Sequence, residues 1–564
     1  MSGIRVLRGA GVVLAVALLA VLVLMPPAPA RLVPPSWQPQ TTARGVFHIH
    51  TQRSDGTGTV DEVAAAAARA GLDFVIITDH GDGSRQPDRP AYRAGVLVID
   101  GVEISTTGGH YAALGLGRTP YPLGGEPRDV VEDVHRFGGF GVVTHPDSPK
   151  AALAWPEWEL PFDAVEWLNG DSQWRDASAP RLIRAIATYP LQPVGTLAAL
   201  ISRPATLERW SRLAVQRPIV ALAGTDAHAR VGWRHRPDPY EDHAFVRLPS
   251  YEASFRTSSL QVLLLHGLSG QPAEDAAAVL DGIRAGRVHS VLDGRAGPAV
   301  FEFSARSGPA AAREGETLAL TDPAVIRVRA NVPAGGRIVL FRDGVEVHRV
   351  RAQELTYATD RPGGYRAEVW LSAGTRAVPV PWIVGNPIYV GTRPRTPARD
   401  PIAAGEVVAK VTPAGAWHME RDGVSAGDVG RLGDDVRLTY RLGPSGTVAP
   451  YAALIAGIAV PAGASFLTFH AVADRPMRVS VQLRKPAGGE GERWHRSVYL
   501  DLAPREIVIP LVEMTPVGAT SRRLPALAAV DSLLFVVDTV NAGPGASGSF
   551  TVSNVRLLGA QASR

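Results

Sequence analysis

Apolar and polar positions alternate in two different ways along the chain. Between residues 45 and 300, short apolar strands such as DFVIITDH and VLVIDGVEIS alternate with amphipathic helices such as PRDVVEDVHRF. From residue 301 onward, apolar and polar residues alternate with a period of two, and Gly and Pro separate the runs. The first pattern predicts an α/β fold with a mostly parallel sheet, and the second predicts all-β sandwiches.

The period-two region divides into two parts. Runs such as VIRVRANV and GYRAEVWL predict a small β-sandwich over residues 301–390. The stretch GTRPRTPARDP, residues 391–401, has the composition of a linker. Residues 402–564 contain further strands, among them RVSVQLRK and SLLFVVDTV, and their spacing predicts a jelly-roll-like sandwich.

The first 44 residues have the pattern of a targeting segment. Arg5 and Arg8 precede an apolar stretch, Gly9–Met25, and an A-x-A-like Ala28-Pro29-Ala30 follows it. We therefore predict a signal peptide over residues 1–30 and a linker over 31–44. The apolar stretch is also just long enough to span a bilayer, so an uncleaved membrane anchor is the alternative. In both cases the protein is expected to be exported, to the periplasm or the cell exterior.

Composition restricts the chemistry more than the charge does. The 564 residues include no cysteine, which excludes disulfides, cysteine metal sites and a cysteine nucleophile. A bound metal ion must therefore be held by His, Asp and Glu. Lys and Arg number 58 against 54 Asp and Glu, a formal charge of +4 with no long basic run. This charge indicates no specific nucleic-acid tract.

Nine His, Asp and Glu residues follow or end the predicted strands of the α/β part. The spacing His48-x-His50 places both imidazoles on one face of a strand, and Asp226-x-His228 repeats it. Sites in parallel α/β folds form at the carboxyl ends of strands, so we expect these side chains to meet there. Buried unpaired imidazoles and carboxylates are costly, and a polynuclear metal site would remove that cost. The predicted ligands are His48, His50, Asp55, His80, Glu103, His110, His145, Asp226 and His228.

Other residues of this part are candidates for supporting roles. Asp79 and Asp147 stand beside ligand histidines and could orient imidazoles or serve in ordinary turns and caps. Arginines could hold an anionic substrate through bidentate contacts. The candidates for that role are Arg175, Arg203 and Arg230. Four tryptophans could wall a substrate pocket or pack under a long loop, namely Trp155, Trp158, Trp167 and Trp174.

The ordered motifs HIHTQRSDG, TDH, VE, H, THPD and GTDAH resemble those of the PHP (polymerase and histidinol phosphatase) superfamily over residues 45–300. The phrase PWIVGNPIYV is similar to one in the CehA/McbA-type metallohydrolases, which carry an appended sandwich. The resemblance implies a distorted (β/α)7 barrel with two or three divalent metal ions. Ligands of nitrogen and oxygen without sulfur allow Zn, Mn or Fe.

The resemblance also implies how the ligands are shared. One ion would lie on His48, His50 and Asp226, with Glu103 bridging to a second ion on His110 and His145. Asp55, His80 and His228 would form a third site.

The function expected from these residues is metal-dependent hydrolysis by an exported or membrane-anchored protein. A hydroxide bridging two ions would attack a phosphoester, with Glu103 and Asp226 as catalytic residues. Two alternatives remain, a CehA-type hydrolase of carbamate or amide esters and a non-catalytic glycan-binding surface protein. The expected partners are a small-molecule ester or phosphoester, a glycan at the C-terminal sandwich, and the membrane if the N-terminal helix is not cleaved.

Overall fold

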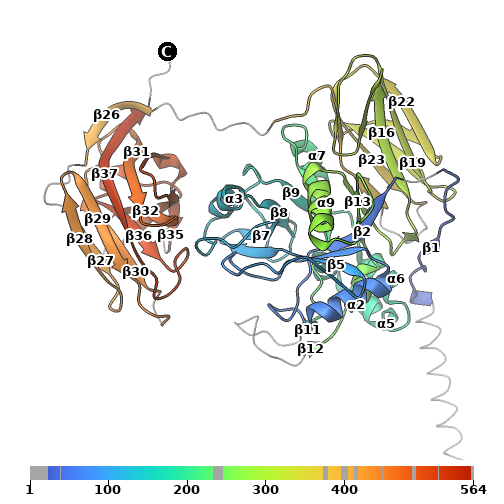
Figure 1. Cartoon of the computed structure of the whole chain (residues 1–564), viewed down its shortest axis with the longest axis horizontal. Helices are drawn as coiled ribbons and strands as arrows, with labels where there is room; N and C mark the ends of the chain where they lie inside the picture. Colours follow the sequence, from blue (N-terminus) through green and yellow to red (C-terminus); the bar gives the residue numbers. More distant parts are fainter. Residues whose placement is uncertain are drawn as a thin grey trace, which may run out of the picture. The chain divides into compact units, whose positions relative to one another are not determined.

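The computed structural model describes residues 23–37, 40–232, 245–372, 379–395, 404–411, 417–446, 449–485, 491–518 and 520–560. The chain forms two compact units (Figure 1). Unit 1 comprises Met1–Asp82, Gln86–Gly117 and Glu126–Pro397, and unit 2 comprises Gly83–Arg85, Arg118–Gly125 and Ala398–Arg564.

The first sheet of unit 1 is built on three parallel strands, β2 (Thr42–Phe47), β3 (Phe74–Ile77) and β5 (Val96–Asp100). On the other side of β2, strand β13 (Ser259–Leu263) pairs antiparallel with it, and β14 (Val288–Val291) pairs antiparallel with β13. These strands are buried, which explains their apolar composition.

Strands from the predicted small sandwich continue this same sheet. Strand β24 (Ile383–Gly385) pairs with β14, and β23 (Gly363–Trp370) pairs with β24. Asn386 joins the two regions further, because its side chain bonds both backbone groups of Ala221 and the carbonyl of Val288. These bonds give a structural role to the asparagine of the PWIVGNPIYV stretch. The remaining strands of the sheet are β4 (Ala91–Arg93), β18 (Thr317–Leu318), β20 (Arg337–Arg342), β21 (Val345–Val350) and β25 (Ile388–Val390).

A separate four-stranded antiparallel sheet completes the sandwich part of unit 1. Its strands are β16 (Phe301–Ser307), β17 (Ala310–Arg313), β19 (Ala324–Ala330) and β22 (Glu354–Thr359). Two short pairs also occur, β1 (Ala30–Arg31) with β15 (Ala296–Gly297) and β11 (Val231–Gly232) with β12 (Phe245–Val246).

The other large sheet of unit 1 has the order β10-β9-β8-β7-β6. Its strands are β6 (Val102–Thr106), β7 (Gly109–Leu114), β8 (Phe140–Thr144), β9 (Ala164–Asn169) and β10 (Val220–Gly224). Strands β8, β9 and β10 are parallel, whereas β6, β7 and β8 pair antiparallel.

The predicted distorted (β/α)7 barrel over residues 45–300 is therefore wrong. Its strands belong to two sheets with antiparallel members, and the residues that the structure describes are 41% strand against 16% helix. A two-residue turn, Thr107 and Gly108, joins β6 to β7 where a barrel would place a helix. The sequence misled here because strands buried on both faces are apolar throughout, whatever their direction. Strand β7 is such a strand.

Helix α2 (Val60–Ala70) begins and ends as its sequence predicts. Thr59 and Glu62 form a capping box, and Gly71 ends the helix with a φ of 72°. Four helices lie between β9 and β10 and shape one side of the site described below. They are α4 (Gly170–Arg175), α5 (Ala179–Thr188), α6 (Pro193–Leu200) and α7 (Ala205–Leu213). The others are α3 (Pro127–Arg136), α8 (Tyr251–Phe255) and α9 (Pro272–Ala285).

Unit 2 is a sandwich of two antiparallel six-stranded sheets, so the β-sandwich predicted for this part of the chain is confirmed. Its core includes Leu438, Leu454, Phe469 and Phe535, which are nearly inaccessible. One sheet holds β26 (Ala404–Lys410), β28 (Ala426–Leu432), β29 (Asp435–Arg441), β31 (Ala464–Ala473), β34 (Arg505–Pro510) and β37 (Ser547–Ala560). The other holds β27 (His418–Arg421), β30 (Tyr451–Gly457), β32 (Met477–Lys485), β33 (Glu492–Leu500), β35 (Thr515–Val517) and β36 (Ser532–Asp538).

The predicted N-terminal hydrophobic helix falls on residues 1–30, of which 1–22 lie outside the described part of the chain. Among the residues that are described, no helix combines the length and the apolar character needed to cross a bilayer.

Candidate metal centre

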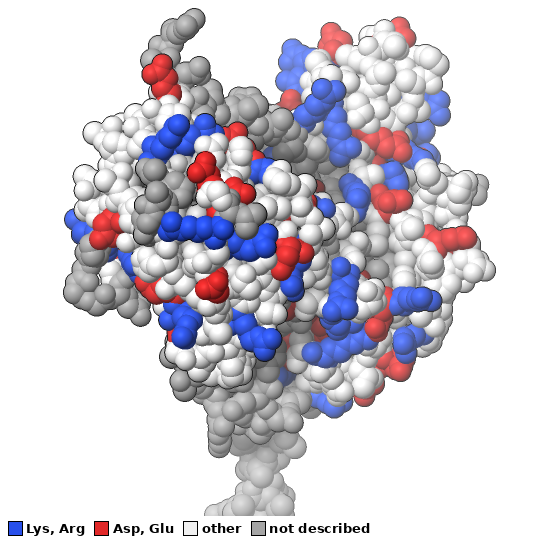
Figure 2. Space-filling view, turned by 60° about the vertical axis from the view of Figure 1, so that its left-hand side comes forward, with Lys and Arg blue, Asp and Glu red and all other residues white. Residues whose placement is uncertain are grey.

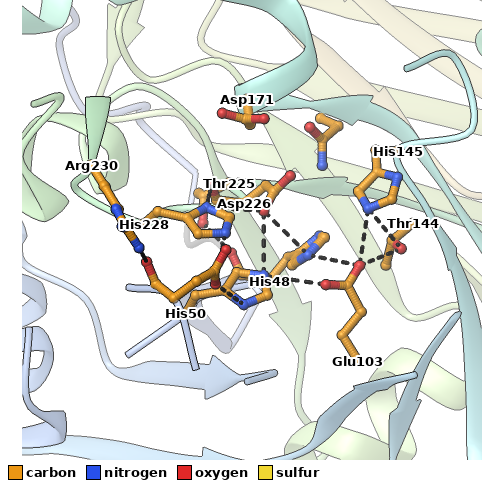
Figure 3. Close-up of polar contacts among 12 residues, drawn as sticks. His48, His50, Glu103, Thr144, His145, Asp171, Thr225, Asp226, His228 and Arg230 are labelled. Carbon is orange, nitrogen blue, oxygen red and sulfur yellow. Dashed lines mark hydrogen bonds and ion pairs between the residues drawn. The ribbon is translucent and has the colours of Figure 1, made fainter. Parts of the chain in front are cut away.

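The nine predicted ligands come together where the two large sheets of unit 1 meet. Figure 3 labels His48, His50, Glu103, His145, Asp226 and His228 among them. Two isolated parallel bridges mark this meeting, one between Ile49 and Ala227 and one between His80 and Glu103. The first bridge brings the segment that follows β2 beside the segment that follows β10. The second brings the end of β3 against β6. Ligands from six separate strands or the segments that follow them thereby converge.

The ligand atoms form four overlapping groups, and the atoms in each group lie within 4.8 Å of one another. The groups are His48, His50 and Asp226; His48, Glu103 and His145; His80, Glu103 and His110; and His50, Asp55, His80 and His228. This division differs from the one implied by the resemblance, because His110 groups with His80 and His145 groups with His48.

The carboxylate of Glu103 lies at the centre of the cluster. Its side chain is 1% exposed, and its two oxygens lie between 3.0 and 3.4 Å from five imidazoles. The distances are 3.2 Å to His48, 3.3 Å to His50, 3.2 Å to His80, 3.4 Å to His110 and 3.0 Å to His145. A carboxylate in this position can bridge two cations, one on each oxygen.

Asp226 and Asp55 complete the carboxylate set. Asp226 Oδ1 lies 3.4 Å from a ring nitrogen of each of His48, His50 and His228. Asp55 Oδ1 lies 3.2 Å from His228 Nε2 and 3.4 Å from His50 Nδ1. Asp55 therefore serves the more exposed side of the cluster.

Three histidines are oriented by hydrogen bonds at the ring nitrogen Nδ1. His48 Nδ1 lies 2.7 Å from Glu166 Oε1, and His145 Nδ1 lies 3.0 Å from the carbonyl oxygen of Leu153. His228 Nδ1 lies 3.0 Å from the carbonyl oxygen of Asp226. A ring N–H that donates on this side leaves the Nε2 lone pair for a cation, the usual arrangement of metal-binding histidines.

Glu166 is the important residue that the sequence reasoning missed. It lies in β9, fully buried, and its second oxygen accepts hydrogen bonds from the backbone of His145 and from Asn169 Nδ2. The one available signal was a carboxylate inside the apolar run AVEWLN, since a buried charge needs a specific partner. The predicted supporting residues Asp79 and Asp147 contact other groups instead.

Asp79 orders the loop that carries Asp55. Its oxygens accept from the backbone and hydroxyl of Thr51 and from the hydroxyl of Ser54 at 2.6–2.7 Å. Asp147 accepts from the backbone of Thr206 in the first turn of α7. Asp79 thus supports the site through the loop, and Asp147 serves as a helix cap.

Replacing Gly224 with Ala is expected to weaken metal binding by roughly 10- to 100-fold, the range for losing a partner that orients a ligand. An added Cβ would lie 1.5 Å from Glu166 Oε1, so the carboxylate would move away from His48. Metal titration of purified protein measures the effect. Gly117→Ala is the matched control, because a Cβ there meets nothing within 4 Å. Equal metal affinities in both variants would contradict the role of Glu166.

Three ligand residues adopt left-handed backbone conformations, which are uncommon outside glycine. The φ angles are 67° for His48, 34° for His145 and 49° for Asp226. Strain of this kind persists where surrounding structure enforces it, and it concentrates at functional sites.

Several buried ligand atoms have no hydrogen bond within the described structure. They are His48 Nε2, His50 Nε2, His110 Nδ1 and Glu103 Oε2. Buried polar atoms nearly always have a partner, so unpaired atoms that converge on one point need an explanation. Nitrogen and oxygen donors in this arrangement fit divalent cations.

The pKa values of the carboxyl groups and of the histidines in the cluster are shifted in different ways. Burial opposes ionisation of Glu103 and Asp226, yet the surrounding histidines hold the pKa of each carboxyl well below its usual range. Burial lowers the pKa of His80 to about 4. For His228 burial acts the same way, but Asp55 and Asp226 outweigh it and raise the pKa to about 10. The cluster therefore holds anionic carboxylates that favour cations.

The hydroxyl of Tyr251 ties together two backbone segments that carry ligands. It accepts hydrogen bonds from the amides of Thr57 and Gly58 and donates to the carbonyl oxygen of His50 at 2.7 Å. The carbonyl oxygen of His228 lies 3.2 Å away. Tyr251 thereby links the backbone segments that carry His50, Asp55 and His228.

Removing this hydroxyl as Tyr251→Phe is expected to cost roughly 1–3 kcal/mol, because two buried amides lose their acceptor. Binding of one metal ion should weaken while the others are retained, as measured by metal content after dialysis. Tyr365→Phe is the control, since its buried hydroxyl bonds Thr359 and Arg361 in the sandwich part. The positioning role fails if both variants keep the same metal content as the parent chain.

The predicted arginines and tryptophans have different positions. Arg175 forms an ion pair with Asp171 and lies over Trp174, and Arg230 donates to the carbonyl oxygen of Asp55. Arg203 lies over Trp370. Trp174 alone among the four tryptophans lines the cavity next to the cluster. Trp155, Trp158 and Trp167 are packed in the core.

No protein-family model matches the chain. Over 138 residues the chain is 33% identical to an uncharacterized protein of Methanocaldococcus jannaschii, a match that covers 22% of this chain and 80% of that protein. The chain therefore belongs to the same family as this archaeal protein.

Similar solved structures include the family 11 carbohydrate-binding module of a cellulosomal cellulase of Clostridium thermocellum. It is 18% identical, with a TM-score of 0.23, over 28% of this chain and 96% of that one. An agarase is 9% identical with a TM-score of 0.21, over 28% of this chain and 25% of that one. Likeness at these scores carries no argument about either unit.

Proposed function

We propose that unit 1 is a metal-dependent hydrolase of the PHP superfamily, similar to the CehA/McbA type, in an exported protein. The observation that carries the proposal is the position of Glu103, whose buried carboxylate lies within 3.4 Å of five imidazoles. A cluster of this kind without a cation would leave buried ligand atoms unpaired, at considerable cost.

The nine ligand residues would hold two or three divalent ions, of Zn, Mn or Fe. When bound, such ions supply a Lewis acid and lower the pKa of water. The chain's own residues orient the imidazoles through Glu166 and the carbonyl oxygens of Leu153 and Asp226. They also exclude bulk water from Glu103, because the carboxylate is almost fully buried.

A phosphoester is the substrate class that the charges near the cluster favour. Asp171, Asp226 and Asp55 together raise the pKa of the Arg175 guanidinium against the effect of burial, so this cation lies within electrostatic range of the ligand carboxylates. Burial and the neighbouring Arg175 lower the pKa of Lys150. Two cations at this edge would attract an anionic substrate. Carbamate or amide esters are the alternative.

The surface supports a small-molecule partner rather than a nucleic acid. Figure 2 shows basic and acidic side chains interspersed over the visible face, without a continuous basic stripe. The formal charge of +4 agrees with this distribution.

Metal analysis of the purified full chain, combined with a substrate screen, tests the proposal. We expect two or three ions per chain and release of 4-nitrophenol from its phosphate monoester or diester. Turnover of an aryl carbamate alone would select the alternative. Less than one ion per chain after growth with Zn, Mn and Fe, together with no turnover, would refute metal-dependent hydrolysis.

A second role is proposed for the sandwich of unit 2, contact with a glycan. It rests on the fold alone, because a β-sandwich that forms its own compact unit can act as a separate binding module. Affinity electrophoresis of the full chain in gels that contain soluble polysaccharides tests this role. Unchanged mobility in every glycan would exclude it for those glycans. Glycan binding is compatible with hydrolysis by unit 1.

A further inference from the structure

A cavity opens directly beside the cluster, on the side of Asp226 and His228. Its internal volume is about 50 Å³ and it opens to solvent, so it has room for one small group of a ligand rather than for a whole large molecule. The segment from Thr225 to Arg230 forms one wall, so two ligand residues border the space. A molecule bound at the metal centre would extend into it.

The facing wall is apolar and comes from the helices inserted between β9 and β10. Leu168 is the next-to-last residue of β9, Leu197 and Leu200 lie in α6, and Ile201 follows that helix. Leu168, Leu200 and Ile201 are each no more than 6% exposed, which means that they form a fixed surface. Trp174 of α4 lies at the rim.

Four of the polar side chains that line the cavity form hydrogen bonds within the protein. Asp171 accepts from Trp174 Nε1 and pairs with Arg175. Gln173 Oε1 accepts two hydrogen bonds from Ser202, at 2.6 and 2.9 Å. The hydroxyls of Thr225 and Thr257 donate to the carbonyl oxygens of His48 and Ala253. These four groups are therefore already used within the protein, and the wall formed by Leu168, Leu197, Leu200 and Ile201 offers a ligand no hydrogen bonds from its side chains.

We infer that this cavity binds an apolar group of the substrate, of the size of a phenyl ring or a branched alkyl chain. The reacting ester would lie at Asp226 and His228 while the apolar group contacts Leu197 and Leu200. The inference rests on the proposed hydrolase function and specifies its substrate class as esters with a bulky apolar substituent. Sugar phosphates and nucleotides would fit poorly, because their polar groups would lose water without gaining partners.

Two inert phosphonates test the inference on the full-length protein loaded with metal. Phenylphosphonate and methylphosphonate share the anionic head and differ only in the apolar group. Burial of the phenyl group should make phenylphosphonate bind roughly 10- to 100-fold more tightly in isothermal titration. A preference below about 2-fold would overturn the inference.

A variant that fills the cavity tests whether the preference for phenylphosphonate arises there. Leu197 is only half-buried, so Leu197→Trp should fold and occupy the space, which should reduce the preference for phenylphosphonate to about 2-fold or less. Leu197→Gln keeps the volume and should also reduce it. Leu191→Trp is the matched control, because Leu191 is 61% exposed and lies outside the cavity lining. An undiminished preference in both Leu197 variants would overturn the assignment to this cavity.

The same experiment distinguishes failure of the hydrolase proposal from failure of the cavity assignment. If neither phosphonate binds and the protein holds no metal, the hydrolase proposal itself fails and this inference fails with it. If both phosphonates bind equally well to a metal-loaded, active protein, only the apolar cavity assignment fails.

Discussion

Replacing Glu103 with Gln is expected to lower hydrolytic turnover by roughly 100- to 1,000-fold or more, the loss typical for removing one electrostatic group from a catalytic centre. Two of the four ligand groups include Glu103. An amide offers one oxygen and no negative charge, and its NH2 would face imidazole nitrogens. The bound metal should fall by at least one ion per chain. Elemental analysis and steady-state turnover measure the two effects.

Glu302→Gln is the control for this substitution. Glu302 pairs with Arg329 on the sandwich part of unit 1, at 2.6 Å and away from the nine ligands. Removing that charge should leave metal content and turnover within about 2-fold of the parent, because partly exposed ion pairs contribute little. Parental turnover in Glu103→Gln would refute the proposed mechanism, even if the protein still bound metal.

Removing metal with a chelator is expected to abolish turnover and to destabilise unit 1 selectively. A ligand present at about 1,000 times its Kd stabilises the folded state by about 4 kcal/mol. For a domain of this size, we expect the thermal midpoint of unit 1 to fall by roughly 10 °C. Within the described part of the chain, every ligand group belongs to unit 1. The transition of unit 2 should therefore stay unchanged, which provides an internal control in calorimetry.

Restoring Zn, Mn or Fe one at a time then identifies the metal that the ligands prefer. The correct ion should return both the thermal midpoint and the turnover, whereas Ca should return neither, since it prefers oxygen ligands. A midpoint of unit 1 that does not respond to chelation would show that the cluster is held together by its own ion pairs.

The nine candidate ligands could be read from the sequence because their residue types and positions follow a simple rule. Each is a His, Asp or Glu at the end of an apolar strand or in an adjacent loop, and unpaired groups there would be costly. The same reasoning could not determine which ligands share an ion. His110 groups with His80 rather than His145 because the bridge between His80 and Glu103 sets the distances.

The hydrophobic pattern of the sequence predicted one part of the fold correctly and another part wrongly. The period-two runs of residues 404–560 predicted a sandwich correctly, because exposed and buried faces alternate along strands such as β29. The barrel prediction failed because strands buried on both faces carry no signal for direction. Strand β7 looked like part of a parallel fold, yet a two-residue turn reverses the chain before it.

By itself, the sequence determined which ligand types a metal site in this protein could have, since the absence of cysteine and the placement of imidazoles and carboxylates depend only on residue identity and order. Tertiary structure alone decided which residues position that chemistry and what lies beside it. Glu166 bonds His48 across 118 residues of sequence, and Tyr251 bonds the backbone of His50 across 201 residues. Leu197 lines the cavity together with Asp226. Contacts over such separations depend on how the sheets and inserted helices pack, and no local pattern records that packing.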